Sequence, residues 1–452
     1  MSEGTSLKRV AVVGVGVCGL CVLRHFSPDP RYEVTAYEQR DRVGGIWNYP
    51  EGCEAHGNVP DEASPYFCRM YRHLRINVPR DLSHFREFPH LPDLPSFFSR
   101  SDLLRYLQRY TDHFDLKKHI KFRHQALSIE PFDPSVPHTC WRVRVKTLGD
   151  ETETTETFDV VIVCNGHFNR PYIPRLAGIQ SFKGKVIHSC DYRVPEPFAD
   201  QRVLVVGGGP SARDIALEII QAAKSVVITP STYSSAYVET FPNVSITPLP
   251  VTFTQNGSLY TVPAKKAAAD EEARQGQQEV DFVILGTGYQ FDIPFIGQNC
   301  GVKVSRGRVT PLYRHIINCN HPSMAFIGLL TGLPVLGAGV EDQVLFYKAY
   351  LDGRMQLPSV RQMKQDCERE YRQRREKGLP GHDAHYMGAE PVFQYCRQLA
   401  DEAGFPCVEP VAEDMFVAHS TNVQINPLNF REYEYSKTSA DSFTTHKNPS
   451  RY

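Results

Sequence analysis

Residues 9–20 read RVAVVGVGVCGL, an apolar β-branched run that breaks into three spaced glycines and then resumes as an apolar segment. This pattern predicts a buried strand, a tight turn and the start of a helix. Gly14 permits the turn, Gly16 lets the backbone approach a pyrophosphate, and Gly19 lets the helix pack on the strand. The helix N-terminus then offers N–H groups to phosphates, so the stretch is typical of a dinucleotide-binding turn.

The same pattern returns at residues 202–214, which read RVLVVGGGPSARD. Gly207 and Gly209 take the first two glycine positions, and Ala212 is the tolerated substitute in the third. A single turn of this kind occurs by chance, but two copies in the same strand-to-helix context are a strong signal. We therefore predict an α/β fold with two Rossmann-like dinucleotide-binding domains.

A later apolar strand that ends in glycine accompanies each turn, at residues 159–166 and 281–289. After residue 281 the chain is expected to return to the first unit. The second domain is then inserted into the first. The expected boundaries are 1–168 with 281–452 for the discontinuous first domain, and 169–280 for the second.

The two units differ at the residue that would contact the ribose of a bound dinucleotide. Glu38 follows the strand 33–37 of the first unit, where an acid hydrogen-bonds ribose hydroxyls. The corresponding position of the second unit is Ser231, so no acid is there to repel a 2′-phosphate, although no arginine is there to bind one. NADP is thus favoured over NAD, with Ser231 as a hydroxyl donor, and NADH is left open.

Composition narrows the remaining classes. The 452 residues carry 50 Lys and Arg against 51 Asp and Glu, and this balance lacks the basic field of a nucleic-acid-binding protein. The N-terminus has no signal-peptide core and no run reaches the ~20 apolar residues of a membrane-spanning helix. We expect a cytoplasmic protein without a transmembrane segment, and peripheral attachment to a membrane is left open.

Further motifs point to one family. Phe182, Gly184, His188 and Tyr192 stand at the spacing FxGxxxHxxxY, alongside Gly14, Gly16 and Gly19 and alongside Gly207, Gly209, Ser211 and Asp214. With the segments 38–47, 71–77 and 286–289, they span residues 9 to about 358. The chain resembles the flavin-containing monooxygenases, and is similar to soluble S- and N-oxygenating enzymes of the GS-OX-like type.

The resemblance implies a definite chemistry. FAD would lie in the first unit and NADPH in the second, and the reduced flavin would react with O2 to give a C4a-hydroperoxyflavin. One oxygen atom would then pass to the nucleophilic nitrogen or sulfur of a small amine or sulfide, as in N,N-dimethylaniline-type monooxygenases. The cofactor carries the hard chemistry, and the protein binds, orients and excludes water. The site is expected at the junction of the two units.

Site residues follow from the resemblance by position. Gly45, Ile46 and Trp47 would lie along FAD, and Asn77 would sit where flavin and nicotinamide meet and act as the catalytic residue. The segment of Ser211, Ala212, Arg213 and Asp214 matches the family's NADP-phosphate segment. The chain departs from the family at Ile76, which replaces the threonine that usually precedes this asparagine.

Three further features of the sequence allow predictions. Gln343 precedes an apparent helix whose N-terminus could face the flavin, with ordinary capping by Glu341 or Asp342 as the alternative. His188 is expected to fix the linker through backbone hydrogen bonds rather than transfer protons. The polar tail from residue 419 lacks a hydrophobic anchor, and a homodimer is left open.

Three other functions remain as alternatives. A Baeyer–Villiger ketone monooxygenase has a related motif that ends in Trp-Pro, whereas this chain has Tyr192-Arg193. A flavin disulfide reductase needs a redox dithiol, and Cys18 and Cys21 lie in the phosphate turn instead. A non-catalytic nucleotide-binding protein on the same fold would explain Ile76 and the missing arginine.

Overall fold

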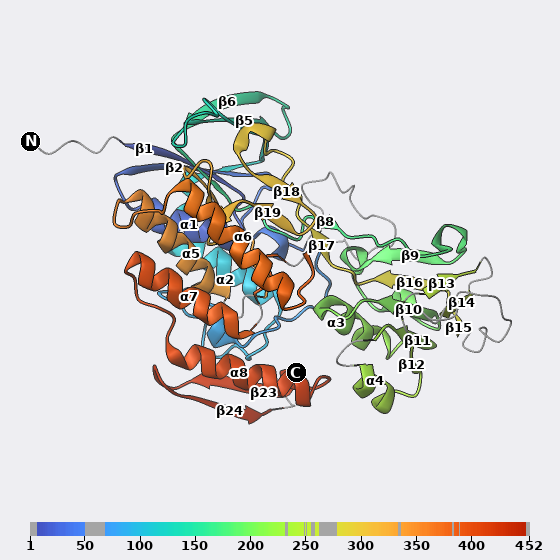
Figure 1. Cartoon of the computed structure of the whole chain (residues 1–452). Coiled ribbons are helices and arrows are strands. Elements are labelled where there is room, and N and C mark those ends of the chain that lie inside the picture. Colours follow the sequence, from blue (N-terminus) through green and yellow to red (C-terminus); the bar gives the residue numbers. More distant parts are fainter. Residues whose placement is uncertain are drawn as a thin grey trace, which may run out of the picture.

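The structure is a computed structural model, and it describes residues 7–49, 68–230, 234–247, 249, 251–254, 258–261, 278–332, 336–381, 384–387 and 389–448. These residues form two bodies of unequal size, each built around a parallel sheet (Figure 1). The larger body contains the N-terminal strand and the C-terminal helices. The smaller body is formed by the middle of the chain.

The sheet of the larger body has parallel strands from β22 to β3 and an antiparallel edge made by β20 and β21. In spatial order its strands are β20 (Leu312–Tyr313), β21 (Ile317–Asn318), β22 (Met324–Phe326), β7 (Val160–Val163), β1 (Lys8–Val13), β2 (Tyr32–Glu38) and β3 (Ile120–Phe122).

The sheet of the smaller body is parallel throughout. In spatial order its strands are β12 (Val244–Ile246), β11 (Ser225–Ile228), β10 (Arg202–Val206), β16 (Phe282–Leu285) and β9 (Lys185–His188). The chain enters this sheet after β7 and returns to the first with β20 to β22. The prediction of two Rossmann-like domains, the second inserted into the first, is confirmed.

The position of β16 differs from the expected boundary at residue 280. This strand lies between β10 and β9, with Val203 to Val206 in register with Phe282 to Leu285. Because β16 is hydrogen-bonded to β10 on one side and to β9 on the other, it belongs to the second sheet. The second sheet therefore extends at least to Leu285.

The remaining elements cover and connect the sheets. The antiparallel strands are β4 (His124–Pro131), β5 (Trp141–Thr147) and β6 (Glu153–Phe158); β13 (Val251–Phe253), β14 (Ser258–Thr261) and β15 (Gln278–Glu279); β18 (Lys303–Ser305) and β19 (Arg308–Thr310). The longer helices are α1 (Val17–Phe26), α2 (Arg100–His113), α3 (Pro210–Ile219), α4 (Ser234–Thr240), α5 (Leu336–Leu351), α6 (Val360–Glu376), α7 (Ala389–Ala403) and α8 (Pro410–Ile425).

The sheet of the larger body separates two layers of the core, and successive side chains of β1 point into alternate layers. Val10 and Val12 face the layer that contains the helices α1, α2, α5 and α7. Ala11 and Val13 face the layer beneath β4 to β6. Successive strand residues point to opposite faces, so an all-apolar strand indicates burial on both sides.

Two short strands connect the bodies. β8 (Arg170–Pro171) pairs antiparallel with β17 (Tyr289–Gln290), and both lie between the two bodies in Figure 1. His188 supports this crossing, because its Nε2 pairs with the carbonyl oxygen of Gly288 at 3.0 Å and its Nδ1 accepts the N–H of Cys190 at 3.1 Å. Burial lowers the pKa of His188, which favours this neutral, hydrogen-bonded form.

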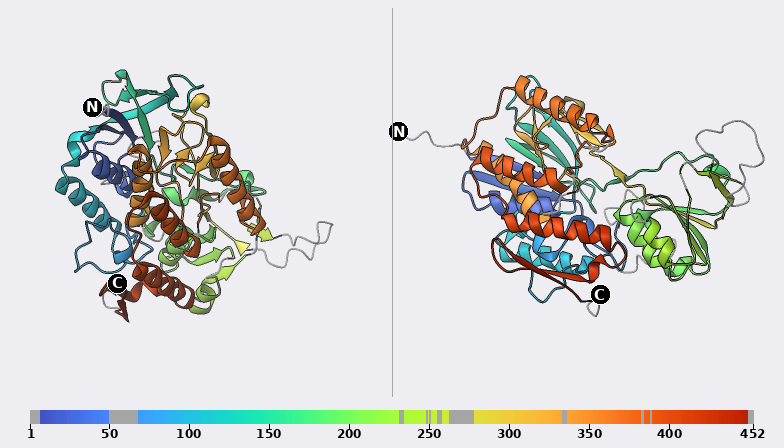
Figure 2. Two further views of the ribbon diagram at one scale, coloured as in Figure 1. Left: turned by 60° about the vertical axis from the view of Figure 1, so that its left-hand side comes forward. Right: turned by 60° about the horizontal axis from the view of Figure 1, so that its bottom comes forward.

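The C-terminal segment crosses from one body toward the other. After α8 the chain forms the short helix η10 (Phe430–Glu432) and a hairpin of β23 (Tyr433–Lys437) and β24 (Phe443–Lys447). The N–H of Ser96 donates to Glu434 at 2.9 Å, which holds the hairpin on the larger body. In the right-hand view of Figure 2, the red C-terminal elements lie beside the green helices of the smaller body. Within the described residues, no helix combines the length and apolar character needed to cross a membrane.

Candidate functional site

The first glycine turn has the geometry that the sequence predicts. Gly14 has a φ of 94°, and a Cβ there would lie 2.7 Å from the carbonyl oxygen of Cys164. A Cβ at Gly19 would lie 2.0 Å from the carbonyl oxygen of Gly14. Both positions therefore require glycine. Helix α1 begins directly after Gly16, and within the described residues no side chain caps it. Its first N–H groups suit a phosphate.

Glu38 lies at the end of β2, beside the first turn. One carboxylate oxygen accepts the N–H of Val15 at 2.9 Å, and the other accepts the N–H of Arg40 at 2.9 Å. Burial raises the pKa of this carboxyl, while the two backbone donors act in the opposite direction. The acid is thus positioned to accept hydroxyl donors from a ribose beside the turn.

The segment of Gly45, Ile46 and Trp47 packs against the first turn. It forms the short helix η1, which the N–H of Gly44 ties to the carbonyl of Val15 at 3.1 Å. All three residues are half-buried, so they retain surface that a ligand along the turn could cover. The structure therefore places this segment beside the first turn.

The second turn has the same geometry as the first, except that Ala212 replaces the third glycine. Gly207 has a φ of 127°, and a Cβ there would lie 2.2 Å from the carbonyl oxygen of Gly286. Ala212 replaces the third glycine because the facing residue, Gly286, has no side chain: a Cβ at Gly286 would lie 2.6 Å from that of Ala212. Gly209 precedes α3, and a Cβ there would meet no described atom within 4 Å. Among the described residues, this side of the turn is open.

A small pocket, open to solvent, lies against the second turn. Gly207, Gly208, Arg213, Thr229 and Tyr237 are among the residues that line it. The hydroxyl of Thr229 accepts the N–H of Gly207 at 2.9 Å, which fixes the turn to the end of β11. Ser211 is exposed at the start of α3. Ser231, the expected hydroxyl donor, lies outside the described residues.

Asn77 is exposed, and the C-terminal segment contacts it at two points. The Nε2 of His419 pairs with its backbone carbonyl at 2.9 Å, and the guanidinium of Arg431 donates to its Oδ1 at 2.5 Å. Arg431 also donates to both carboxylate oxygens of Asp214 on α3, at 3.2 and 2.6 Å. Asn77 of the first domain is thereby linked to the helix of the second turn.

Asp214 has a different environment from that expected of a phosphate-segment residue. It is buried, and it accepts hydrogen bonds from Arg431 and from the hydroxyl of Tyr71 at 3.2 Å. Burial acts to raise its pKa, but the charge and hydrogen bonds of Arg431, together with the charge of Arg213 and the hydroxyl of Tyr71, outweigh burial, and the pKa is lowered. Arg431 was not singled out by sequence analysis, because nothing in a polar tail indicates which arginine reaches a distant domain.

The expectation for Gln343 is wrong. Helix α5 begins at Leu336, so Gln343 lies two turns inside the helix and is fully buried. Its Oε1 accepts the N–H of Gly328 at 2.9 Å, and its Nε2 donates to the hydroxyl of Tyr395 at 3.4 Å. The side chain fixes the loop after β22 instead of marking a helix N-terminus near a flavin.

The two cysteines of the first turn have the properties of packed thiols. Cys18 and Cys21 lie on α1, and both are free in the described structure. Burial raises the pKa of Cys18 to about 12 and that of Cys21 well above its usual range. A reactive dithiol needs a lowered pKa, so this geometry disfavours a disulfide reductase.

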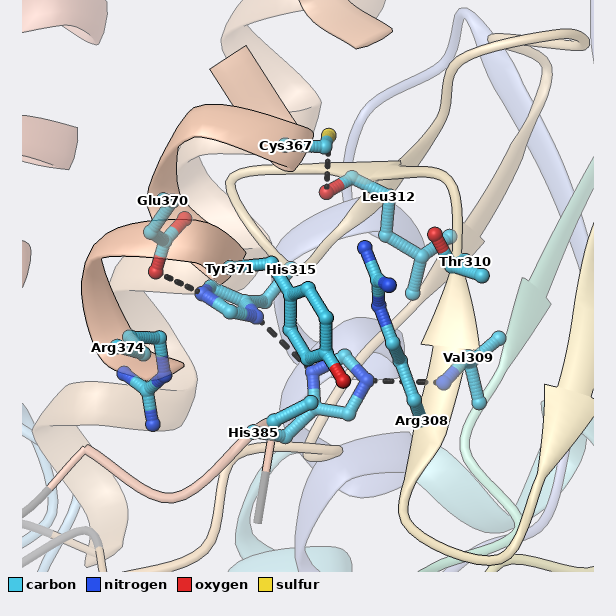
Figure 3. Close-up of a pocket in the computed structure, with 11 residues that line it drawn as sticks. Arg308, Val309, Thr310, Leu312, His315, Cys367, Glu370, Tyr371, Arg374 and His385 are labelled. Carbon is cyan, nitrogen blue, oxygen red and sulfur yellow. Dashed lines mark hydrogen bonds and ion pairs between the residues drawn. The ribbon is translucent and has the colours of Figure 1, made fainter. Parts of the chain in front are cut away.

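A second pocket lies away from both turns, between α6 and β19 (Figure 3). His315 pairs with Glu370 at 2.7 Å and with His385 at 2.9 Å, and His385 accepts the N–H of Val309 at 3.0 Å. Within the described residues, no group of His, Cys, Asp and Glu side chains has the arrangement of a metal site. These polar groups satisfy one another and hold α6 on the sheet.

The fold and the two turns define a protein with two dinucleotide-binding domains, and comparison with known proteins identifies its family. The model of the flavin-binding monooxygenase-like family matches residues 7–245 and 260–405. The chain therefore belongs to this family, whose cofactors are FAD and NADPH, and it is a flavoprotein oxidoreductase.

Two of the similar proteins are named as oxygenases of nitrogen or of sulfur. The chain is 27% identical to senecionine N-oxygenase of Tyria jacobaeae, over 99% of this chain and 94% of that protein. It is 32% identical to the flavin-containing monooxygenase FMO GS-OX4 of Arabidopsis thaliana, over 89% of this chain and 86% of that protein. The solved structure of S-allyl-L-cysteine S-oxygenase from Allium sativum is 28% identical with a TM-score of 0.82, covering 94% of this chain and 95% of that one.

Proposed function

We propose that this chain is an FAD- and NADPH-dependent monooxygenase that transfers one oxygen atom to the nucleophilic nitrogen or sulfur of a small molecule. FAD would bind to the first turn and NADPH to the second. The observation that carries the proposal is the pair of glycine turns, each before a helix that no described side chain caps, on two separate parallel sheets. Two such turns fit two dinucleotides.

The first turn fits FAD. Glu38 would accept ribose hydroxyls, the N-terminus of α1 would hold the pyrophosphate, and the half-buried segment 45–47 would lie along the rest of the cofactor. A Cβ at Gly16 would lie 3.6 Å from the Cα of Gly45, so the segment 45–47 lies against this turn on its Gly16 side.

The second turn fits NADPH better than NADH. Thr229 and Pro230, which directly follow β11, are not acids, and Arg213 lines the pocket at this turn. A cationic group near this pocket favours a phosphate. The pocket at the turn and the open side of Gly209 supply the space for a pyrophosphate.

The bound flavin, once reduced by NADPH, supplies the activation of dioxygen. The protein orients the two cofactors through the β8–β17 crossing and presents Asn77 at the junction of the domains. An amide N–H at that position stabilises negative charge on oxygen. The named nitrogen and sulfur oxygenases among the similar proteins support an amine or a sulfide as the acceptor.

The proposal is tested with purified protein reconstituted with FAD. We expect a yellow flavin spectrum, bleaching by NADPH faster than by NADH, and stoichiometric oxygenation of a tertiary amine or a thioether. A cyclic ketone tested in parallel should not be converted. Absence of flavin binding, or ketone oxygenation without amine or sulfide oxygenation, would overturn the proposal.

A further inference from the structure

Arg431 occupies an unusual place for a residue of the C-terminal tail. It lies on η10, and its guanidinium contacts both domains: Asp214 on α3 of the second, and Asn77 in a loop of the first. The side chains of Arg431 and Asp214 are 16% and 10% exposed, so this ion pair is largely shielded from solvent. A shielded, bidentate Arg–carboxylate pair holds its geometry better than a surface pair.

The chemistry of arginine determines how Asn77 is oriented. A guanidinium has only donors, so the amide oxygen of Asn77 must face Arg431. The amide nitrogen of Asn77 then points away from the guanidinium and is presented as a donor. His419 holds the backbone carbonyl of the same residue, so both the main chain and the side chain of Asn77 are fixed by the C-terminal segment.

We propose that Arg431 is a positioning residue: it locks the Asn77 amide with its N–H groups toward the junction of the domains, and it makes this orientation depend on the position of α3. The inference rests on the proposed function for its catalytic consequence. Arg431 does not touch the reacting atoms in this arrangement. It acts through Asn77, and Asp214 supplies the charge that holds it in place.

A first experiment needs no cofactor and no turnover. Hydrogen–deuterium exchange of the cofactor-free chain is compared between the wild type, Arg431→Met and Lys447→Met. Lys447 pairs with Glu432 at 3.1 Å in the same C-terminal segment and serves as the matched control. Arg431→Met should raise exchange in residues 71–79 and in the first turn of α3, whereas Lys447→Met should not. Unchanged exchange in both regions would overturn the inference that Arg431 links Asn77 to α3.

A second experiment measures how NADPH oxidation is divided between product and peroxide. When the Asn77 amide is not positioned, NADPH, a proton and O2 give NADP⁺ and H2O2 instead of oxygenated product. The ratio of peroxide formed to NADPH consumed therefore measures the loss of coupling, that is, the fraction of NADPH oxidised without oxygenation. Removing a hydrogen bond to a charged group changes such a ratio on the order of tenfold. We expect this rise in Arg431→Met, with the rate of flavin reduction by NADPH changed less than about twofold because hydride transfer precedes it.

Two further variants distinguish a role of Arg431 in orienting Asn77 from a role in stabilising the fold. Arg431→Lys keeps a positive charge for Asp214 but lacks the planar fork that reaches Asn77 as well, so it should keep the wild-type melting temperature and still release excess peroxide. Asn77→Asp still accepts from Arg431 but has no N–H to present, so it should keep the exchange protection of residues 71–79 and lose coupling. The proposal would be overturned if Arg431→Lys released no more peroxide than the wild type. It would also be overturned if Arg431→Met lowered the stability without raising the peroxide ratio, because Arg431 would then have only a structural role.

Failure of the proposed function gives a different result. If the wild-type chain bound no FAD or oxidised no NADPH, the proposed effect of Arg431 on catalysis would fail. The exchange experiment would still show whether Arg431 links Asn77 to α3. Conversely, a coupled wild-type enzyme whose Arg431→Met variant is equally coupled would refute the positioning role alone.

Discussion

The Gly209→Ala variant separates ligand binding from folding at the second turn. A Cβ at this position meets no described atom within 4 Å, and the backbone has a φ of −81° that alanine adopts without strain. Losing glycine at a helix N-cap costs about 0.5–1 kcal/mol, and the reduced entropy of the unfolded chain returns about 0.4–1 kcal/mol. The protein's stability should therefore change by less than about 1 kcal/mol.

The methyl group instead projects into the open side of the turn, where we place the pyrophosphate of NADPH. Pro210 has no N–H, so the donors of the first turn of α3 are the backbone amides of Ser211 and Ala212. Displacing the phosphate from one charge-assisted hydrogen bond costs about 1.5–3 kcal/mol, which corresponds to roughly 10-fold to 100-fold weaker binding.

Stopped-flow reduction of the FAD-loaded variant at several NADPH concentrations measures this loss, and thermal unfolding in parallel measures stability. The flavin content should match the wild type, because Gly209 belongs to the other turn. An unchanged NADPH dependence with an unchanged melting temperature would show that the pyrophosphate does not pass over Gly209, and the assignment of the second turn would fail.

Three further variants test other parts of the structure. Gly207→Ala forces alanine to a φ of 127° and places its Cβ 2.2 Å from the carbonyl oxygen of Gly286, so urea unfolding should show a loss of more than about 2 kcal/mol; near-wild-type stability would contradict the turn geometry. His188→Ala removes the hydrogen bond to Gly288 and should lower stability by about 1–3 kcal/mol while NADPH oxidation per folded molecule stays within about twofold; a far larger loss of rate would indicate a catalytic histidine. Burial lowers the pKa of His419 to about 4, so between pH 4 and about 6.5 the folded state binds fewer protons than the unfolded state and stability falls as the pH falls. His419→Gln should reduce this acid dependence by on the order of 1–3 kcal/mol in unfolding curves at about pH 4.5 and 7, and an unchanged dependence would refute the assignment.

The glycine turns were predictable because their constraints are local. The φ values of Gly14 and Gly207 and the contact between Gly19 and the Gly14 carbonyl arise within a few residues of chain. Fold class and the order of the domains followed from these turns together with two later apolar strands. The location of the segment 45–47 beside the first turn agrees with the resemblance.

The errors in prediction came from features that depend on longer segments. Helix α5 includes Leu336, seven residues before Gln343, and the expected start was placed too late because Glu341 and Asp342 resemble capping residues. The boundary at residue 280 cut off β16, because an apolar strand does not reveal which of two parallel sheets it joins.

The sequence by itself determined that the chain has two nucleotide-binding turns, the order in which they occur, and the residues of each that must be small, because steric limits on the backbone act over neighbouring residues. Only the tertiary structure decided that Asp214 pairs with Arg431, and that this tail residue, more than 350 positions away, contacts Asn77. Such contacts depend on how whole domains pack, and the free energy that selects one packing is spread over many buried residues rather than written in any one motif.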